Sequence, residues 1–212
     1  MKFSYTLSSE GSTDQMLVPV INWVIEANSS CPYEGTWASP SVYENRGKDV
    51  ETRIAEASRM FPCDILFVHR DVDASSFEAR RREIIGAAEL VRPPCLVVPI
   101  VPERMSEAWF LFDEDAIRNA ADNPRGRRKL PLVSHSVAQR RANPKAILED
   151  ALVTAADVSG RRLEQFRQTL SGRKELVARS IENYAPLRNQ ASFRVFEADV
   201  RAAISNRCRD AA

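Results

Sequence analysis

Apolar residues follow two patterns along residues 1–122: short continuous runs, and longer stretches with the 3.6-residue period of a helix. The short runs predict strands at 3–9, 64–69 and 95–101, and a weaker pattern indicates a short strand near 36–42. The periodic stretches predict helices at 12–27, 49–60, 76–90 and 106–121. Because strands and helices alternate, we predict an α/β fold with a mostly parallel sheet flanked by helices.

The rest of the chain shows no strong strand pattern. A basic loop at 123–134 precedes predicted helices at 144–156, 161–183 and 193–206. We therefore predict two parts: an α/β core over 1–122, and a basic loop with a helical C-terminal region over 123–212, packed on the core. The aromatic side chains of Trp109, Phe110 and Phe112 are expected to find cover against these C-terminal helices.

Two local features mark the first predicted helix. Ser12 and Gln15 have the spacing of a capping box, with Ser12 as the N-cap residue. Pro19 lies inside the apolar pattern and is expected to kink the helix there.

Charge is unevenly distributed along the chain. The whole sequence carries a formal net charge of +1, and 44% of its residues are hydrophobic, enough for a substantial core. The segment 118–147 holds eight basic residues against the single acidic Asp122, a net charge of +7, which leaves the remainder acidic. This asymmetry suits a protein that binds a metal ion in one place and a polyanion in another.

The four cysteines, Cys31, Cys63, Cys95 and Cys208, show no zinc-ligand spacing and are interpreted as buried free thiols of a reducing compartment. The N-terminal residues lack the apolar region of a signal peptide. The apolar run at 95–101 is too short to cross a bilayer. We therefore expect a soluble, cytoplasmic protein with no membrane partner.

Carboxylates follow each of the three main predicted strands. Glu10 follows the first, Asp71 and Asp73 follow the second, and Glu107 follows the third. In a parallel sheet these positions share one edge, where ligands usually bind. Uncompensated carboxylates at close range repel one another, so a divalent cation is the expected partner, and all-oxygen ligands favour Mg²⁺ or Mn²⁺ over zinc.

Glu10-Gly11 at one strand end and Asp71-Val72-Asp73 at another resemble the signature of the Toprim domain of topoisomerases, primases and related nucleases. The nucleases of the OLD (overcoming lysogenization defect) group are a closer match, because Asp14 lies four residues after Glu10 and Glu107 supplies a further acidic position. The segments VVPIVPERMSEAWFLFD, NPKAILEDAL and PLRNQASFRVFEADV look like a stand-alone Toprim-like bacterial family often encoded beside an ATPase. The resemblance covers roughly residues 3–200.

The resemblance implies that 1–122 is a Toprim-like catalytic core. It implies phosphodiester hydrolysis of DNA or RNA by a two-metal mechanism with Mg²⁺ or Mn²⁺. Glu10, Asp71 and Asp73 would hold one ion, and Asp14 and Glu107 the other. Glu10 also has the alternative role of general base, and Lys145 would stabilise charge at the scissile phosphate.

The basic run is the expected contact with the nucleic-acid backbone, through Arg125, Arg127, Arg128 and Lys129. A separate ATPase is the expected protein partner, in an anti-phage defence system. Two departures from the family limit the resemblance: the sequence contains no phosphate-binding G-x-x-x-x-G-K-[ST] loop of its own, and the helical C-terminal third has no counterpart in the topoisomerase core.

Other interpretations remain open at this point. The chain could be a non-catalytic regulatory subunit that binds an ATPase through the aromatic helix and the C-terminal helices. A receiver-like or phosphatase-like domain would need an acidic pair at the first strand, where Glu10-Gly11 stands instead. Asp14 and Glu107 also fit the acidic first turn of a helix, Lys145 fits a solvated surface, and His69 is expected to be packed or hydrogen-bonded inside its strand.

Overall fold

The computed structural model describes residues 2–43, 49–132 and 143–209. Its sheet has four parallel strands in the order β2-β1-β3-β4. The strands are β1 (Phe3–Ser8), β2 (Tyr33–Ala38), β3 (Ile65–His69) and β4 (Leu96–Ile100). The α/β prediction, with its parallel sheet and helical C-terminal region, is confirmed.

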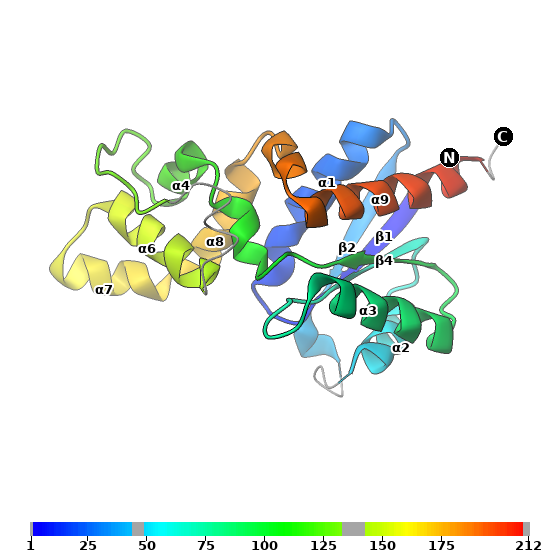
Figure 1. Ribbon diagram of the computed structural model, residues 1–212. Helices are drawn as coiled ribbons and strands as arrows, with labels where there is room; N and C mark the ends of the chain where they lie inside the picture. The colour runs from blue at the N-terminus through cyan, green and yellow to red at the C-terminus, as the bar shows by residue number, and fades with distance from the viewer. Residues whose placement is uncertain (1, 44–48, 133–142, 210–212) are drawn as a thin grey trace.

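Two layers of helices cover the sheet (Figure 1). Side chains alternate between the faces of a strand, so Leu66 and Val68 of β3 face one layer while Ile65 and Phe67 face the other. The first layer consists of α2 (Val50–Met60) and α3 (Phe77–Val91), and the second contains α1 (Leu17–Asn28) and α9 (Ala191–Arg209). β3 is buried along its whole length, as its continuous apolar run predicts.

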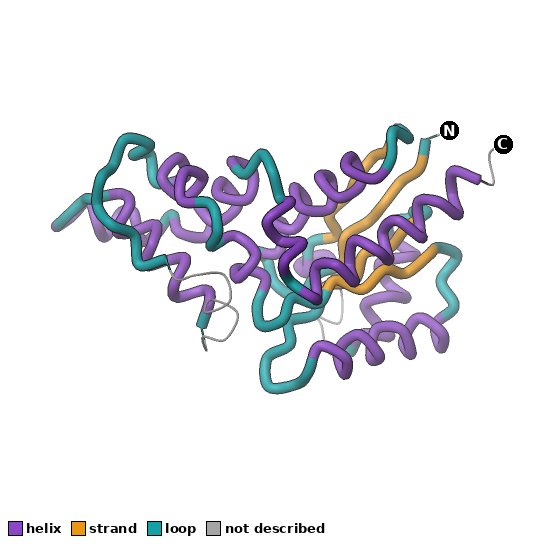
Figure 2. The backbone as a smooth tube through the Cα atoms, turned by 45° about the horizontal axis from the view of Figure 1, so that its top comes forward, coloured by secondary structure: helices purple, strands orange, loops and turns teal. Residues whose placement is uncertain are grey.

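Beyond one end of this sandwich lies a second group of helices, which we call the helical lobe (Figure 2). It consists of α4 (Glu114–Ala120), α6 (Pro144–Ala156), α7 (Gly160–Gln168) and α8 (Leu170–Ser180). The short 3₁₀ segments are η1 (Asp14–Met16), η2 (Pro40–Val42), η3 (Ser106–Phe110) and η4 (Ala185–Asn189). Because α4 packs with α6 and α8 while α9 packs on the sheet, the lobe and the sandwich interleave along the chain; the division at residue 122 stays a prediction.

Several predicted helices begin or break elsewhere. α1 starts at Leu17, and η1 before it has no side-chain cap, so the predicted Ser12 capping box is wrong. Pro19 lies inside α1, as predicted, but in its first turn, where a missing N–H removes no helical hydrogen bond, so the reason for the expected kink does not apply there. The predicted helix at 106–121 divides because Asp113 caps α4, accepting a hydrogen bond from the backbone N–H of Ala116 at 2.9 Å.

The aromatic residues after β4 pack as the sequence predicts. Trp109 is fully buried, with ring centroids 5.4 Å from Phe193 and 5.9 Å from Phe196 of α9. Phe110 contacts Tyr184 edge-to-face at 6.4 Å. These contacts fix the segment that follows β4, and with it the backbone beside the carboxyl end of β3.

The cysteine prediction is correct only in part. Cys63 and Cys95 are free thiols, each half-buried rather than fully buried. Cys31 is disulfide-bonded, so the prediction of four free thiols is wrong, because cysteines distant in the sequence can meet in the fold. Within the described parts of the chain, no helix has the length and apolar character needed to span a membrane.

Candidate active site

The carboxylates predicted at the ends of β1 and β3 meet at the same edge of the sheet. β1 and β3 are hydrogen-bonded parallel neighbours, with Ser8 opposite Val68 near their carboxyl ends. Glu10 Oε2 accepts a hydrogen bond from the backbone N–H of Asp71 at 3.3 Å. Strand topology alone therefore brings these two acidic residues together, although they are 61 positions apart in the chain.

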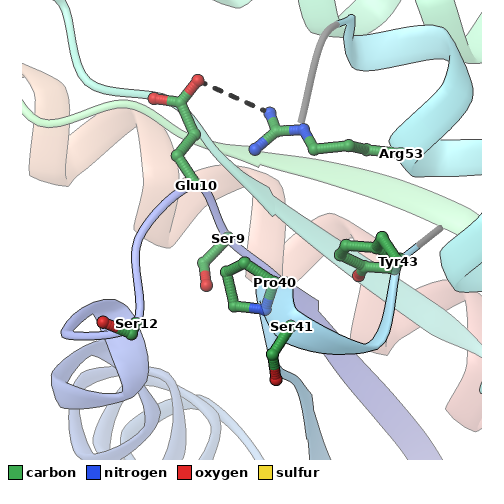
Figure 3. A pocket seen from close by; sticks show the side chains of 7 residues that line it. All are labelled: Ser9, Glu10, Ser12, Pro40, Ser41, Tyr43 and Arg53. Atoms are coloured by element: carbon green, nitrogen blue, oxygen red, sulfur yellow. Dashed lines mark ion pairs between the residues drawn. The ribbon is translucent and has the colours of Figure 1, made fainter. Parts of the chain in front are cut away.

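Beside Glu10, a pocket of about 350 Å³ opens between the carboxyl ends of β1 and β2 (Figure 3). It is lined by three residues after β1, three residues after β2 and one from α2: Ser9, Glu10, Ser12, Pro40, Ser41, Tyr43 and Arg53. We call it the Arg53 pocket. Its position beyond the strand ends is the usual place for a ligand in an open parallel sheet.

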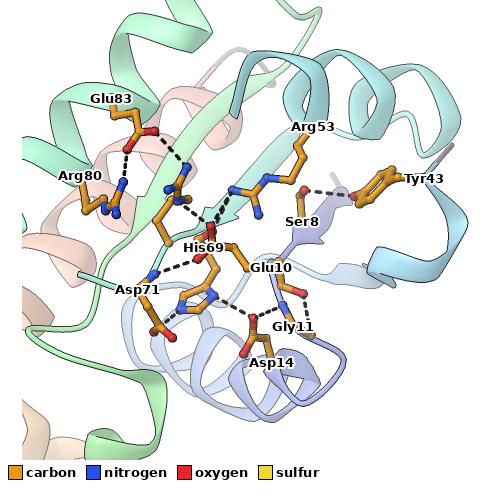
Figure 4. Close-up of polar contacts among 12 residues, drawn as sticks. Ser8, Glu10, Gly11, Asp14, Tyr43, Arg53, His69, Asp71, Arg80 and Glu83 are labelled. Atoms are coloured by element: carbon orange, nitrogen blue, oxygen red, sulfur yellow. Dashed lines mark hydrogen bonds and ion pairs between the residues drawn. The ribbon is translucent and has the colours of Figure 1, made fainter. Parts of the chain in front are cut away.

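His69, the last residue of β3, is fully buried between two carboxylates (Figure 4). Its Nδ1 lies 3.0 Å from Asp14 Oδ2, and its Nε2 lies 3.2 Å from Asp71 Oδ1. The second contact is an ion pair without the angle of a hydrogen bond. The prediction of a hydrogen-bonded histidine inside the strand is confirmed.

The two carboxylates decide the charge of this histidine. Burial alone would lower the pKa of His69, but the charges of Asp14 and Asp71 outweigh that effect and raise the pKa to about 10. Burial would raise the pKa of Asp14, but His69 and the backbone N–H of Gly11, which donates to Asp14 at 2.8 Å, hold it below its usual value. At neutral pH the site therefore contains an imidazolium between two carboxylates.

Arginine side chains match the charge of Glu10. Arg70 Nε lies 2.7 Å from Glu10 Oε1, and Arg53 lies 3.9 Å from the same oxygen. Arg70 also pairs with Glu83 at 2.9 Å. The sequence analysis expected a divalent cation because it took these carboxylates to be uncompensated. That premise is wrong for Glu10, Asp14 and Asp71, because the side chains of Arg53, His69 and Arg70 pair with them.

The other predicted ligands lie around this centre in different states. Asp73 is exposed and adopts a left-handed backbone conformation with φ of 49°. Asp71 Oδ1 accepts a hydrogen bond from the backbone N–H of Ser106 at 3.1 Å, which brings the segment containing Glu107 to the site. The Glu107 carboxylate itself is buried and lies 3.4 Å from Nζ of the buried Lys174.

The predicted basic contacts lie in the helical lobe. Lys145 is exposed in the first turn of α6, and none of its contacts connects it to Glu10 or Asp71 within the described residues. The loop after α4 exposes all four predicted side chains, Arg125, Arg127, Arg128 and Lys129. Arg128 pairs with Asp157 at 3.0 Å. Figure 1 shows this loop at the outer part of the lobe, away from the sheet; Arg140 and Arg141 of the same basic segment lie outside the described residues.

The donor chemistry at the edge fits Mg²⁺, because Glu10, Asp71 and Asp73 offer only carboxylate oxygens. In the described parts of the chain, no three His, Cys, Asp or Glu side chains are close enough together to hold a metal ion. Glu10 would have to turn from Arg70 to join Asp71 at an ion. Its carboxylate side chain is 35% exposed, which leaves room for that rotation.

Sequence reasoning missed the cations of this site. Arg53 shares a helical face with Val50, Ile54 and Ala57, all buried. A charged residue at an apolar position of an amphipathic helix is the signal that could have identified it. Lys174 offered no comparable signal, because α8 has a weakly defined apolar face and its partners, Glu107 and Glu149, are remote in sequence.

Comparisons of the chain with protein-family models, curated proteins and solved structures found no match in any of the three.

Proposed function

We propose that this protein is a cytoplasmic, Mg²⁺- or Mn²⁺-dependent nuclease that hydrolyses phosphodiester bonds of DNA or RNA. The observation that supports it best is the meeting of Glu10 and Asp71 at the carboxyl edge of β1 and β3. The Toprim-like resemblance supplies the reaction class, and with it the expectation of an ATPase partner in an anti-phage defence system.

In this proposal Glu10, Asp71 and Asp73 hold the ion, which when bound polarises a phosphoryl oxygen and lowers the pKa of a water molecule. The alternative role of Glu10 is that of general base. His69 is a positioning residue, because its imidazolium fixes Asp71 at 3.2 Å while Asp14 fixes the ring from the other side.

The proposed second ion, held by Asp14 and Glu107, makes a larger demand on the protein. Asp14 would have to exchange His69 for the metal, and Glu107 would have to exchange Lys174. We therefore propose the first ion at Glu10, Asp71 and Asp73. A second ion would bind only once Asp14 and Glu107 have exchanged their present partners for the metal.

Nucleic acid would reach this edge with its backbone neutralised by the basic loop and by Lys145, which would stabilise charge at the scissile phosphate. The exposure of Arg125, Arg127, Arg128 and Lys129 supports the loop's part in this, because phosphate contacts need accessible cations.

The experiment is a cleavage assay on plasmid DNA and on RNA with Mg²⁺ or Mn²⁺, alongside calorimetric titration of Mg²⁺. We expect Asp71→Asn and Asp73→Asn to reduce cleavage at least about 100-fold and to weaken metal binding, since each removes a ligand charge. Asp115→Asn is the matched control, because Asp115 is an exposed aspartate on α4. Undiminished cleavage by Asp71→Asn would remove this site from the proposal.

The alternative is a non-catalytic subunit of an ATPase complex. The charge balance favours it: His69, Arg53 and Arg70 already match Glu10, Asp14 and Asp71, so the edge is stable without an ion. The aromatic interface first expected for this role is not available, because Trp109 and Phe110 are buried inside the protein. Absence of both metal binding and cleavage, with the ATPase present, would select this alternative.

A further inference from the structure

Arg53 is a buried cation with an unfilled hydrogen-bonding position. The residue is 2% exposed, and one terminal nitrogen donates to the backbone oxygen of His69 at 3.3 Å. The other terminal nitrogen, Nη1, is buried without a hydrogen-bond partner among the described residues. A buried, unpaired charged donor is costly, so an acceptor supplied by a ligand would stabilise this arrangement.

The guanidinium group forms one wall of the Arg53 pocket. Figure 3 shows it directed toward Glu10 and Ser9, with one terminal nitrogen joined to Glu10 by the ion pair and the other without a marked partner. Glu10 is 3.9 Å away, longer than a hydrogen bond. This ion pair uses Nη2, the same nitrogen that donates to His69, so Nη1 is the nitrogen left for a ligand in the pocket.

The charges around the pocket favour an anion. Glu10 is the carboxylate among the residues that line it, and that carboxylate is paired with Arg70 at 2.7 Å, outside the lining. Arg53 is the lining cation, and its own contact with Glu10 is the longer of the two. Of the two charged residues that line the pocket, the positive charge of Arg53 is therefore less fully compensated than the negative charge of Glu10.

Hydroxyl groups supply further donors on the opposite wall. Ser12 and Ser41 are exposed at the rim of the pocket, and the Ser41 hydroxyl shares a hydrogen bond with the Ser39 hydroxyl at 2.9 Å. Ser9 Oγ lies deeper, where it donates to the backbone oxygen of Gly11 at 3.3 Å and accepts from Trp37 at 3.1 Å. A guanidinium fork facing rotatable hydroxyls is an arrangement that suits a tetrahedral oxyanion.

We propose that the Arg53 pocket binds a phosphate group of a nucleotide, with Arg53 and the hydroxyls of Ser12 and Ser41 as donors. The volume of about 350 Å³ exceeds a bare phosphate and leaves space for part of the attached nucleoside. The inference rests on the proposed function only for its choice of a nucleic acid as the source of that phosphate. On a bound strand, this pocket holds the phosphate next to the one that reaches Glu10 and Asp71.

The test measures binding in EDTA, where metal-dependent cleavage is blocked. The probes are inorganic phosphate, followed by thermal unfolding against chloride of equal ionic strength, and a fluorescent single-stranded ten-nucleotide DNA carrying either a 5′-phosphate or a 5′-hydroxyl. The variants are Arg53→Met and Ser41→Ala, with Arg161→Met as control, because Arg161 is an exposed arginine on α7.

We expect phosphate to raise the Tm of the wild type and of Arg161→Met, because a ligand that binds only the folded state stabilises it. Arg53→Met should lose this rise and bind the oligonucleotide about tenfold more weakly, and Ser41→Ala should bind a few-fold more weakly. Preference for the 5′-phosphate would identify a terminal monoester as the ligand, and equal binding would identify a backbone phosphate; both support the pocket.

Equal phosphate stabilisation of the wild type and Arg53→Met would overturn the inference, as would a wild type that responds to neither probe. Should circular dichroism show that Arg53→Met is unfolded, Arg53→Lys replaces it, since lysine keeps the charge but loses the guanidinium fork. Failure of the nuclease proposal is recognised separately: Arg53-dependent binding without cleavage in Mg²⁺ retains the pocket and rejects the nuclease, and Arg53-independent cleavage does the reverse.

Discussion

Two buried cations lie behind the same edge of the sheet, and they differ in how fully their charges are met. His69 at the end of β3 has a carboxylate on each side, at 3.0 and 3.2 Å. Arg53 on α2 has one carboxylate at 3.9 Å, from Nη2. Its Nη1 has neither a hydrogen bond nor an ion pair among the described residues, whereas His69 Nε2, which also lacks a hydrogen bond, has its ion pair with Asp71. The first cation is locked by the protein, and the second is available to a ligand.

The comparison separates structural charge from functional charge within one site. The buried ion pair of His69 with Asp14 holds η1 against β3, and the hydrogen bond from the Ser106 N–H to Asp71 holds the residues after β3 against the segment after β4. A buried charge that lacks some of its partners must be held in place by the stability of the surrounding fold. Such charges are common at binding sites. Three predictions follow from this difference, ordered by expected size.

The largest effect should come from removing the positive charge of His69 between Asp14 and Asp71. His69→Gln removes the positive charge and leaves Asp14, 5% exposed, without its cation, so we expect the free energy of unfolding to fall by about 3–5 kcal/mol. Urea denaturation measures this change. The double variant with Asp14→Asn is the control and should recover part of the loss, because it removes the unpaired charge. A fall in the free energy of unfolding below about 1 kcal/mol for His69→Gln alone would mean that the contacts of His69 with Asp14 and Asp71 do not stabilise the fold.

The ion pair of His69 with Asp14 should also make the free energy of unfolding depend on pH. The folded-state pKa of His69, about 10, lies above its ordinary value of 6.5, so this contribution is complete below pH 6.5 and is lost as pH rises toward 10, by about 1.4 kcal/mol per pH unit. The pKa of Asp14 is lowered in the folded state, so its contribution is present above pH 3.8 and is lost as pH falls through the folded value.

Because other groups also titrate at alkaline pH, the quantity to measure is the difference in unfolding free energy between the wild type and His69→Gln. That difference should shrink steadily from pH 6.5 to pH 10. A constant difference over this range would show that His69 does not carry the charge.

The smallest effect should come from Arg53. Arg53→Met retains most of the side-chain volume and removes a charge that is poorly paired, so we expect a loss of about 1 kcal/mol or less, mainly from the hydrogen bond to the His69 backbone oxygen. Urea denaturation beside His69→Gln tests this. A loss as large as that of His69→Gln would remove the distinction between the two cations.

The edge of the sheet was predictable because it depends on local patterns. The apolar run before His69 identifies a doubly buried strand, and strand alternation with helices implies parallel neighbours. Those two inferences are sufficient to place Glu10 beside Asp71. In the structure the backbone N–H of Asp71 donates to Glu10 Oε2 at 3.3 Å.

The partners of the acidic residues were not predictable in the same way. Lys174 reaches Glu107 across 67 positions, through the packing of α8 near η3, and no local pattern encodes that contact. Breaks such as Asp113 and Thr169 were missed for a related reason: the residues on both sides of each break are helical, and the change of direction follows from packing in the lobe.

The return of α9 to the sheet affects how the protein can be made. Phe193 and Phe196 of this helix cover Trp109, and α9 also packs beside β4 and α1, elements that precede it by about a hundred residues or more. While residues 191–209 are still being translated, the sheet face that they cover remains open to solvent. The nascent chain therefore exposes an apolar surface until residues 191–209 have been synthesised, and during that time it is vulnerable to aggregation and to chaperone capture.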